Sequence, residues 1–265
     1  MRRWATFSLI TCCLAASGFG QTIDVKSARQ PTATPSASAT PPIPATPEDA
    51  AAYRPILLGQ GPNSLINRID GQSLIKNGQK DGLVMFNCLV DKTGKMIVSA
   101  FYRSSPNSQL LEREVKKRLI DAVFVPGIYN HKPVGAVYYA TVSFVIVQGK
   151  PRLRIFSNQE YPELKKESDF VGPQPVLGGE SGFNGVHYPP AAEAQVPVNG
   201  IADIKVKVDE KGEIQSMSVV GEHPPLIGFG AQALMDLYGA KFIPAFRDGK
   251  PVACEVTLPV YYPEP

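Results

Sequence analysis

The chain has 265 residues, and with 43% hydrophobic and 19% charged side chains it can form a folded core. Its 27 basic and 24 acidic residues give a formal net charge of +3. Because a nucleic-acid-binding protein needs a strongly basic face, this balance argues against a nucleic-acid partner.

Residues 1–20 have the features of an export signal. Arg2 and Arg3 are followed by the uncharged, mostly apolar run Trp4–Ala16, and small side chains suited to a signal peptidase come next. The alternative is a membrane anchor formed by residues 4–20, although this stretch is shorter than the roughly 20 apolar residues that cross a bilayer. We expect an exported protein that contacts a membrane only if this segment stays uncleaved.

Residues 21–53 are rich in Pro, Thr, Ala and Ser and contain few aromatic or branched apolar side chains. A segment of this composition buries too little apolar surface to offset the entropy lost on folding. Frequent proline also favours an extended backbone. We therefore predict a disordered tether.

The remaining sequence contains an internal repeat, which predicts two copies of one fold. Residues 82–145 align without a gap on residues 200–263 at an offset of 118, and 13 of the 64 aligned positions are identical. Many identities are glycine, proline or aspartate residues of the kind that shape turns. They include Gly82 with Gly200, Asp91 with Asp209, Gly94 with Gly212, Pro106 with Pro224, Pro126 with Pro244, and Lys132-Pro133-Val134 with Lys250-Pro251-Val252.

Each copy begins with a strand, a tight turn and a return strand. Apolar residues alternate with polar ones at the start of copy two, the pattern of a half-buried strand. An Asp-x-x-Gly turn follows, and the return strands are predicted near 96–102 and 214–220. The inward positions are Val84, Phe86, Cys88 and Val90 in copy one and Ala202, Ile204, Val206 and Val208 in copy two.

A helix and a last strand complete each copy. The apolar stripe of the helix is Leu111, Val115 and Leu119 in copy one and Phe229, Ala233 and Leu237 in copy two. In the last strands one face is apolar, and Cys254 shares it, so Cys88 and Cys254 are predicted as core residues rather than as a disulfide. A further short helix is expected at Pro190–Ala194, before copy two.

The predicted fold class is α+β, with two tandem small two-layer domains. Each domain is an antiparallel three-stranded sheet with two helices on one face. The expected boundaries are 54–150 for the first domain, which is diverged, 151–184 for a linker and 185–265 for the second domain.

Motifs for catalysis or metal binding are missing from the sequence. His131, His187 and His223 are scattered without metal-ligand spacing, and no nucleophile elbow occurs. The run Gly228–Ala233 matches a dinucleotide-binding glycine pattern, but it does not directly follow a strand of a parallel sheet. We expect no catalytic residues, no cofactor and no metal, and hence no enzyme.

Copy two resembles the TonB C-terminal domain family. The resemblance covers nearly all of Tyr188–Tyr262 and rests on the start Tyr188-Pro189-x-Ala191-Ala192, the strand from Gly200, and the turn Val208-Asp209-x-x-Gly212. It continues through Phe242-x-Pro244-Ala245-x-x-x-Gly249-x-Pro251-Val252 to Leu258-Pro259-Val260. Copy one resembles the family from Gly82 to Phe144 but lacks the Tyr-Pro start.

The resemblance implies a periplasmic, non-catalytic protein-binding role. Domains of this family bind a short peptide of an outer-membrane transporter by strand addition next to their last strand. An energy transducer of this kind also has an uncleaved transmembrane helix that bears a histidine. Residues 1–20 contain no histidine, so the resemblance implies peptide binding here without implying force transmission.

The residues themselves also point to the last strands. Pro259 lies inside the last strand of copy two, and a proline is tolerated there only if its nitrogen faces away from the neighbouring strand. Thr141 replaces it in copy one, whose longer run is expected to be the better docking edge unless Arg152–Phe156 folds back onto it. The candidate partner-binding residues are Tyr188, Pro189, Val252, Glu255, Thr257, Pro259, Val137, Tyr139 and Thr141.

Two functions from different classes remain open. The first is peptide or protein binding in TonB-dependent outer-membrane transport, with a transporter of that class as the partner. The second is a structural envelope assembly protein whose tandem domains pack together, or form a homodimer, through their edge strands without a transporter partner.

Overall fold

The structure, a computed structural model, describes residues 52–190 and 198–265. The predicted export signal and nearly all of the predicted tether lie outside the described residues, as does most of the short helix expected at Pro190–Ala194. The fold is α+β with mostly antiparallel sheets, as the sequence predicts.

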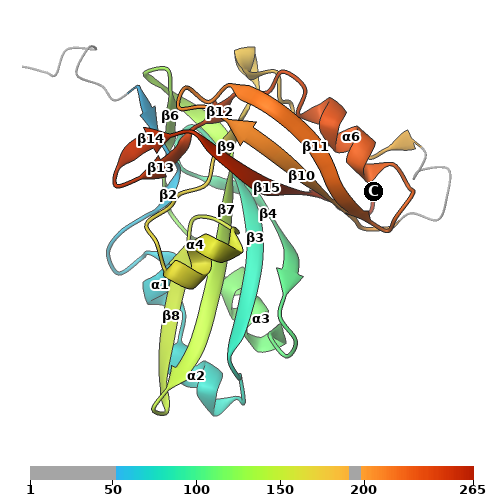
Figure 1. Cartoon of the computed structure of the whole chain (residues 1–265). Helices are drawn as coiled ribbons and strands as arrows, with labels where there is room; N and C mark the ends of the chain where they lie inside the picture. The colour runs from blue at the N-terminus through green and yellow to red at the C-terminus, as the bar shows by residue number, and fades with distance from the viewer. Residues whose placement is uncertain (1–51, 191–197) are drawn as a thin grey trace, which may run out of the picture. The chain divides into compact units, whose positions relative to one another are not determined.

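The first sheet, called the N-terminal sheet below, has the strand order β4-β3-β7-β8. All neighbouring strands in it are antiparallel, and Figure 1 shows the long strand β7 with β8 beside it. The period of two residues along β3 directs every second side chain into the core, as predicted. The bounds are β3 (Gly82–Val90), β4 (Met96–Ser104), β7 (Lys132–Val147) and β8 (Lys150–Phe156).

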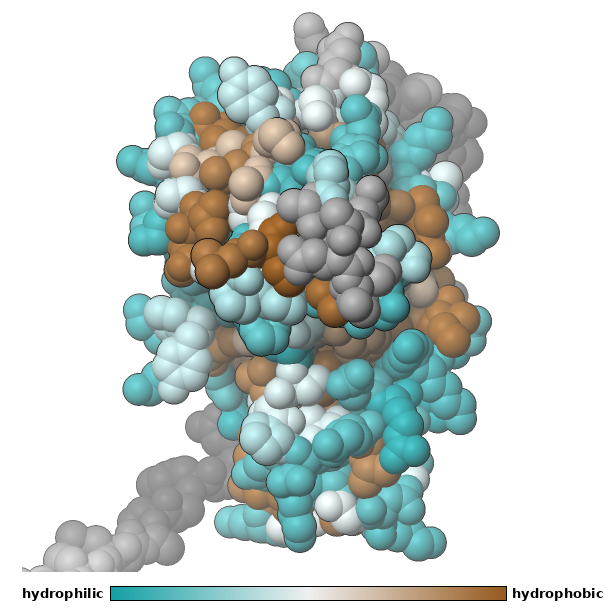
Figure 2. All heavy atoms as spheres, turned by 90° about the vertical axis from the view of Figure 1, so that its right-hand side faces the viewer, coloured by the Kyte–Doolittle hydropathy of each residue, from teal (hydrophilic) through white to brown (hydrophobic). Residues whose placement is uncertain are grey.

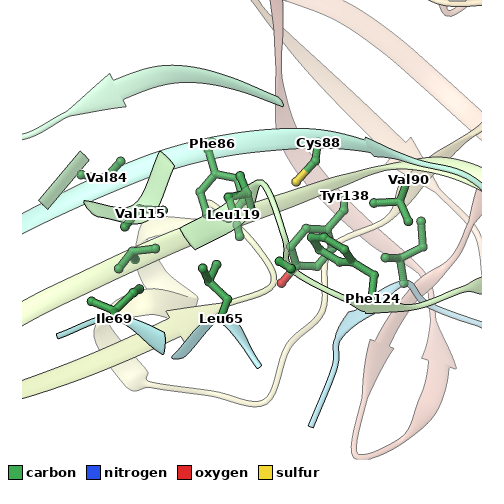
Figure 3. Close-up of a cluster of buried hydrophobic side chains, with 14 of the residues drawn as sticks. Leu65, Ile69, Val84, Phe86, Cys88, Val90, Val115, Leu119, Phe124 and Tyr138 are labelled. Atoms are coloured by element: carbon green, nitrogen blue, oxygen red, sulfur yellow. The ribbon is translucent and has the colours of Figure 1, made fainter. Parts of the chain in front are cut away.

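Three helices pack against one face of this sheet: α1 (Leu65–Arg68), α2 (Gly71–Lys76) and α3 (Gln109–Leu119). The predicted apolar stripe of α3 is fully buried. Figure 3 shows Leu119 beside Phe86, with the rings of Phe124 and Tyr138 close by. These two rings meet edge to face at 5.4 Å between centroids, a favourable geometry for aromatic pairs.

The C-terminal sheet has the order β11-β10-β15 and is covered by helix α6 (Phe229–Asp236). The buried side chains of α6 and Leu237, directly after it, pack on the alternating apolar residues of β10 in a second core. The strands are β10 (Gly200–Val208), β11 (Ile214–His223) and β15 (Cys254–Tyr262).

Element positions in the two parts of the chain are related by the offset of 118 residues. The strands β10, β11, β12, β13 and β14 begin 118 residues after β3, β4, β5, β6 and β7. The pairing of the last strand follows the same offset, since Gly82 pairs with Phe144 and Gly200 with Tyr262. The short strands are β5 (Phe124–Val125), β6 (Gly127–Tyr129), β12 (Phe242–Ile243), β13 (Ala245–Arg247) and β14 (Lys250–Val252).

The segment 151–184, which the sequence analysis takes as a linker, is folded. It contains most of β8, helix α4 (Tyr161–Lys166), strand β9 (Gln174–Leu177) and the 3-10 turn η2 (Gly179–Ser181). Strand β9 pairs with β7 on one side and with β12 on the other. The segment therefore joins the two parts of the chain through backbone hydrogen bonds rather than separating them.

The beginning of the described chain adds two more short pairings. Strand β1 (Tyr53–Arg54) pairs with β6, and β2 (Leu57–Leu58) pairs with β5. The described residues belong to a single compact unit. Among them, no helix is both long and apolar enough to cross a membrane.

Candidate functional site

The outer edge of β15 is the central feature of the candidate site. Strand β15 pairs with β10 along its whole length, from Gly200 with Tyr262 to Val208 with Cys254, without a register shift. On its other side, no strand within residues 52–190 and 198–265 pairs with it. A regular strand with one open side can accept another strand.

The backbone of Thr257 shows which residues of β15 face outward. Its N–H donates to Oε1 of Glu160 at 2.7 Å, and its carbonyl oxygen accepts from Nε2 of Gln159 at 3.0 Å. Because the direction of the backbone groups alternates along an antiparallel strand, Pro259 faces outward as well. Its missing N–H therefore removes no bond to β10, which agrees with the sequence argument that β15 is an edge.

Strand β11 forms the other edge of the C-terminal sheet but is less regular. Its pairing with β10 is shifted twice, between Asp203 and Ile204 and between Lys207 and Val208. Such bulges increase the twist of an edge and hinder the addition of a further strand. Of the two edges, β15 is the better template.

The predicted residues Glu255, Thr257 and Pro259 lie together on β15. Val252 lies on β14 instead, paired with Ala245, so it is not part of this edge.

The predicted start motif serves the fold and does not reach the edge of β15. The hydroxyl of Tyr188 donates to the carbonyl oxygen of Val198 at 2.7 Å and accepts from its N–H at 3.0 Å. Its ring meets that of Phe229 at 5.6 Å, and Pro189 is buried. Tyr188 thus anchors the chain in front of β10.

The expected open edge in copy one is closed by its own chain. Residues 141–147 of β7 pair with β8, and Thr141 pairs with Phe156. Tyr139 is buried in the second core, and Val137 packs partly against it. The condition stated for this edge, that Arg152–Phe156 does not fold back, is not met, so Val137, Tyr139 and Thr141 do not form a free docking edge.

A cavity of about 470 Å³ lies between the N-terminal sheet and the end of β15. This volume is in the range of small-ligand and side-chain pockets. The lining is mostly apolar, with Glu112 and Lys116 of α3 among its polar members. Sequence analysis missed it because its residues come from distant parts of the chain: Leu89, Val98, Phe101, Val137, Tyr139, Phe183, Leu237, Val260 and Tyr261.

A second hollow, of about 360 Å³, lies beside the start of β15 and includes Glu160, Glu163, Arg247 and Cys254. The hydrogen bond from Arg247 lowers the pKa of Glu163. Burial raises the pKa of Glu160, against the effect of the Thr257 N–H, and Glu163 raises it further. Burial also raises the pKa of the Cys254 thiol, to about 12, which leaves it mostly protonated near neutral pH.

Hydrophobic side chains are also exposed elsewhere on the second half of the chain. Figure 2 shows hydrophobic atoms at the surface in its upper part, next to the grey residues. The exposed hydrophobic residues of β11 and its surroundings are Val219, Val220, Leu226 and Met235. Leu226 is the most exposed, at 97%.

Comparison with known families identifies part of the chain. Residues 184–263 match the family model of the Gram-negative bacterial TonB protein C-terminal domain. The matched range includes the whole C-terminal sheet and α6. No curated protein and no solved structure matches the chain significantly.

Proposed function

We propose that the protein is a non-catalytic, TonB-like periplasmic binding protein, because residues 184–263 match the family model of the TonB C-terminal domain. In this proposal an extended peptide of a partner protein joins the C-terminal sheet as a fourth strand on the outer edge of β15. A TonB-dependent outer-membrane transporter is the partner class that the family suggests.

The observation that carries this proposal is the unbroken register of β15 on β10, with no strand of the described residues paired on its other side. An added strand would find backbone donors and acceptors at Glu255, Thr257 and Tyr261, and an acceptor alone at Pro259. The cavity at the end of β15 would receive an apolar side chain of that peptide.

The offset of 118 residues supports a further part of the proposal. We infer that residues 82–145 are a second, diverged copy of the same module, since strands, register and bulges recur at that offset. At the register shifts, Ile97 and Tyr102 of β4 have no paired residue on β3. Gln215 and Val220 of β11, 118 residues later, likewise have no paired residue on β10. In this copy β8 takes the place that a partner strand would occupy, so we assign partner binding to the C-terminal copy.

Export and the state of the N-terminal segment belong to the same proposal. A cleaved signal at residues 1–20 gives a periplasmic accessory binder, whereas an uncleaved segment at residues 4–20 gives an inner-membrane-anchored transducer. Cell fractionation of the full chain distinguishes them, because the anchored form sediments with membranes.

Site-specific crosslinking tests the binding edge. A photoreactive amino acid is placed at Glu255 or Tyr261 on β15 and, as the matched control, at Ser218 on the exposed edge strand β11. We expect one partner segment to crosslink at both β15 positions and not at Ser218. Equal crosslinking from Ser218, or crosslinks from β11 alone, would contradict binding at β15.

The open edge also supports a second candidate function, self-association in an envelope assembly. An antiparallel edge such as that of β15 can pair with the same edge of a second copy around a two-fold axis. Sedimentation analysis decides between the two. A monomer over the micromolar range rules out the homodimer, and a stable dimer that crosslinks through Glu255 favours it over a transporter partner.

A further inference from the structure

The contacts of Thr257 imitate those of a neighbouring strand. A residue in a hydrogen-bonded antiparallel pair exchanges two bonds with its partner, one through its N–H and one through its carbonyl. At Thr257 the carboxylate of Glu160 accepts the first bond and the carboxamide of Gln159 donates the second. The two side chains, called the clasp below, thus fill one residue's place in the missing strand.

The clasp is held from the N-terminal sheet. Only Ser157 and Asn158 separate it from the end of β8, and the carbonyl oxygen of Asn158 accepts from Oγ1 of Thr141 at 2.7 Å. The Asn158 side chain is buried, donates to the carbonyl oxygen of Phe170 at 2.8 Å and accepts from the N–H of Glu160 at 3.1 Å. One stretch of chain therefore closes the last strand of the first copy and reaches across to the last strand of the second.

The hydrogen-bonding groups of the clasp are not fully satisfied. Oε1 of Gln159 is buried and has no hydrogen-bond partner. The carboxylate of Glu160 is half-buried and lies in the same hollow as Glu163. A buried acceptor without a partner and a partly dehydrated carboxylate both destabilise the closed arrangement. On release, both groups would regain water, while a partner strand would restore the two bonds at Thr257.

We propose that the clasp keeps the β15 edge closed in the free protein and that a partner strand binds by displacing Gln159 and Glu160 from Thr257. The inference rests on the proposed function. It defines the partner as an extended peptide that presents its own N–H and carbonyl opposite Thr257. It also explains how a regular edge avoids pairing with other strands before the partner arrives.

Three variants of the full chain test the clasp. Gln159→Ala with Glu160→Ala removes both side chains, whereas Glu160→Gln keeps an oxygen that can accept from the Thr257 N–H. Gln72→Ala with Glu210→Ala changes two exposed side chains and serves as the control. Unfolding midpoints are measured first, to show that all variants remain folded.

Hydrogen exchange at the Thr257 amide measures directly whether the clasp closes the edge. We expect the Thr257 amide to exchange at least about tenfold faster in the double alanine variant than in the unchanged protein. Glu160→Gln should restore most of the protection, and the control should not change it. Unchanged exchange in the double alanine variant would overturn the proposal.

Peptide binding measures whether the clasp competes with a partner strand for the edge of β15. A random peptide library displayed on phage is selected against the double alanine variant, and a selected peptide that protects the β15 amides is then titrated into every variant. We expect about tenfold tighter binding to the double alanine variant than to the unchanged protein. Equal or weaker binding would show that the clasp does not compete with a strand. If no peptide protects β15 in any variant, the proposed strand addition is wrong, and so is the proposal that the clasp competes with a partner strand. The exchange experiment still shows separately whether the clasp closes the edge.

Discussion

The side-chain amide of Gln174 pairs with both backbone polar groups of Ile56. Its Oε1 accepts the Ile56 N–H at 2.7 Å, and its Nε2 donates to the Ile56 carbonyl oxygen at 3.0 Å. Both residues are buried. The pair connects the beginning of the described chain to β9, the strand that links the two parts of the molecule.

Replacing Gln174 with leucine should therefore destabilise the protein. The change leaves a buried N–H and a buried carbonyl without partners, and we expect a loss of about 2 to 4 kcal/mol in the free energy of unfolding. Urea unfolding measures it. Gln72→Leu, at an exposed position of α2, is the matched control and should change the value by less than about 0.5 kcal/mol. Equal effects of the two substitutions would contradict the assigned role of Gln174.

Glu222 should make stability depend on acid pH. Partial burial acts to raise the pKa of its carboxylate, but backbone N–H groups at the start of α6 outweigh this and lower it. The donors include Ile227, Gly228 and Gly230. A carboxyl group whose pKa is lower in the folded state stabilises the fold above its unfolded-state pKa and loses this effect as the pH falls through the folded-state pKa.

Glu222→Gln should accordingly lower the free energy of unfolding by about 1 kcal/mol at neutral pH, as expected for the loss of a capping charge. The difference between the variant and the unchanged protein should shrink as the pH falls from the unfolded-state pKa of Glu222 through its lower folded-state pKa. Thermal unfolding at a series of pH values measures this, with the exposed Glu210→Gln as control. A difference that stays constant with pH would contradict the capping role.

Gly212 should tolerate no side chain. Its φ angle is +82°, and a Cβ atom there would lie 1.7 Å from the carbonyl oxygen of Phe242. Gly249 has a similar φ of +70° but open space around it. Gly249→Ala should cost about 1 kcal/mol from backbone strain alone, whereas Gly212→Ala should cost several times more because the backbone must move. Similar unfolding midpoints for the two variants would disagree with the close contact at Phe242.

Phe183 should contribute to the second core although it lies in the segment first taken as a linker. It is 4% exposed and packs with the residues of β10 and α6. Phe183→Ala should lower the free energy of unfolding by about 3 to 4 kcal/mol through lost contacts and a cavity. Tyr161→Ala, at a side chain that is 72% exposed, should have little effect. A small effect at Phe183 would mean that this segment is only loosely attached.

Local patterns predicted the strands and the main helices well. Alternation along β3 and β10, the Asp-x-x-Gly turns and the apolar stripes of α3 and α6 depend on neighbouring residues, and each appears in the structure as expected. The position of Pro259 also indicated correctly that β15 is an edge.

Long-range contacts of single side chains were not predictable in the same way. Gln159 and Glu160 bind Thr257, almost a hundred positions away, and no periodic pattern in the sequence predicts such a contact. Strand β9 forms only two residue pairs with each neighbour, and its Gly- and Pro-rich surroundings favoured a loop. The cavity combines residues of many elements, so its lining becomes visible only when the sheets are placed together.

The double pairing of β9 means that the limits of the family resemblance are not the limits of an autonomous folding unit. A polypeptide starting at residue 184 would retain the matched family segment but leave behind Phe170, Phe183 and the strand beside β12. Its second core would then lie partly open to water. We therefore expect the matched segment and the residues that cover it to unfold together, because Phe170 and Phe183 lie in its core and Gln159 and Glu160 bind the backbone of β15.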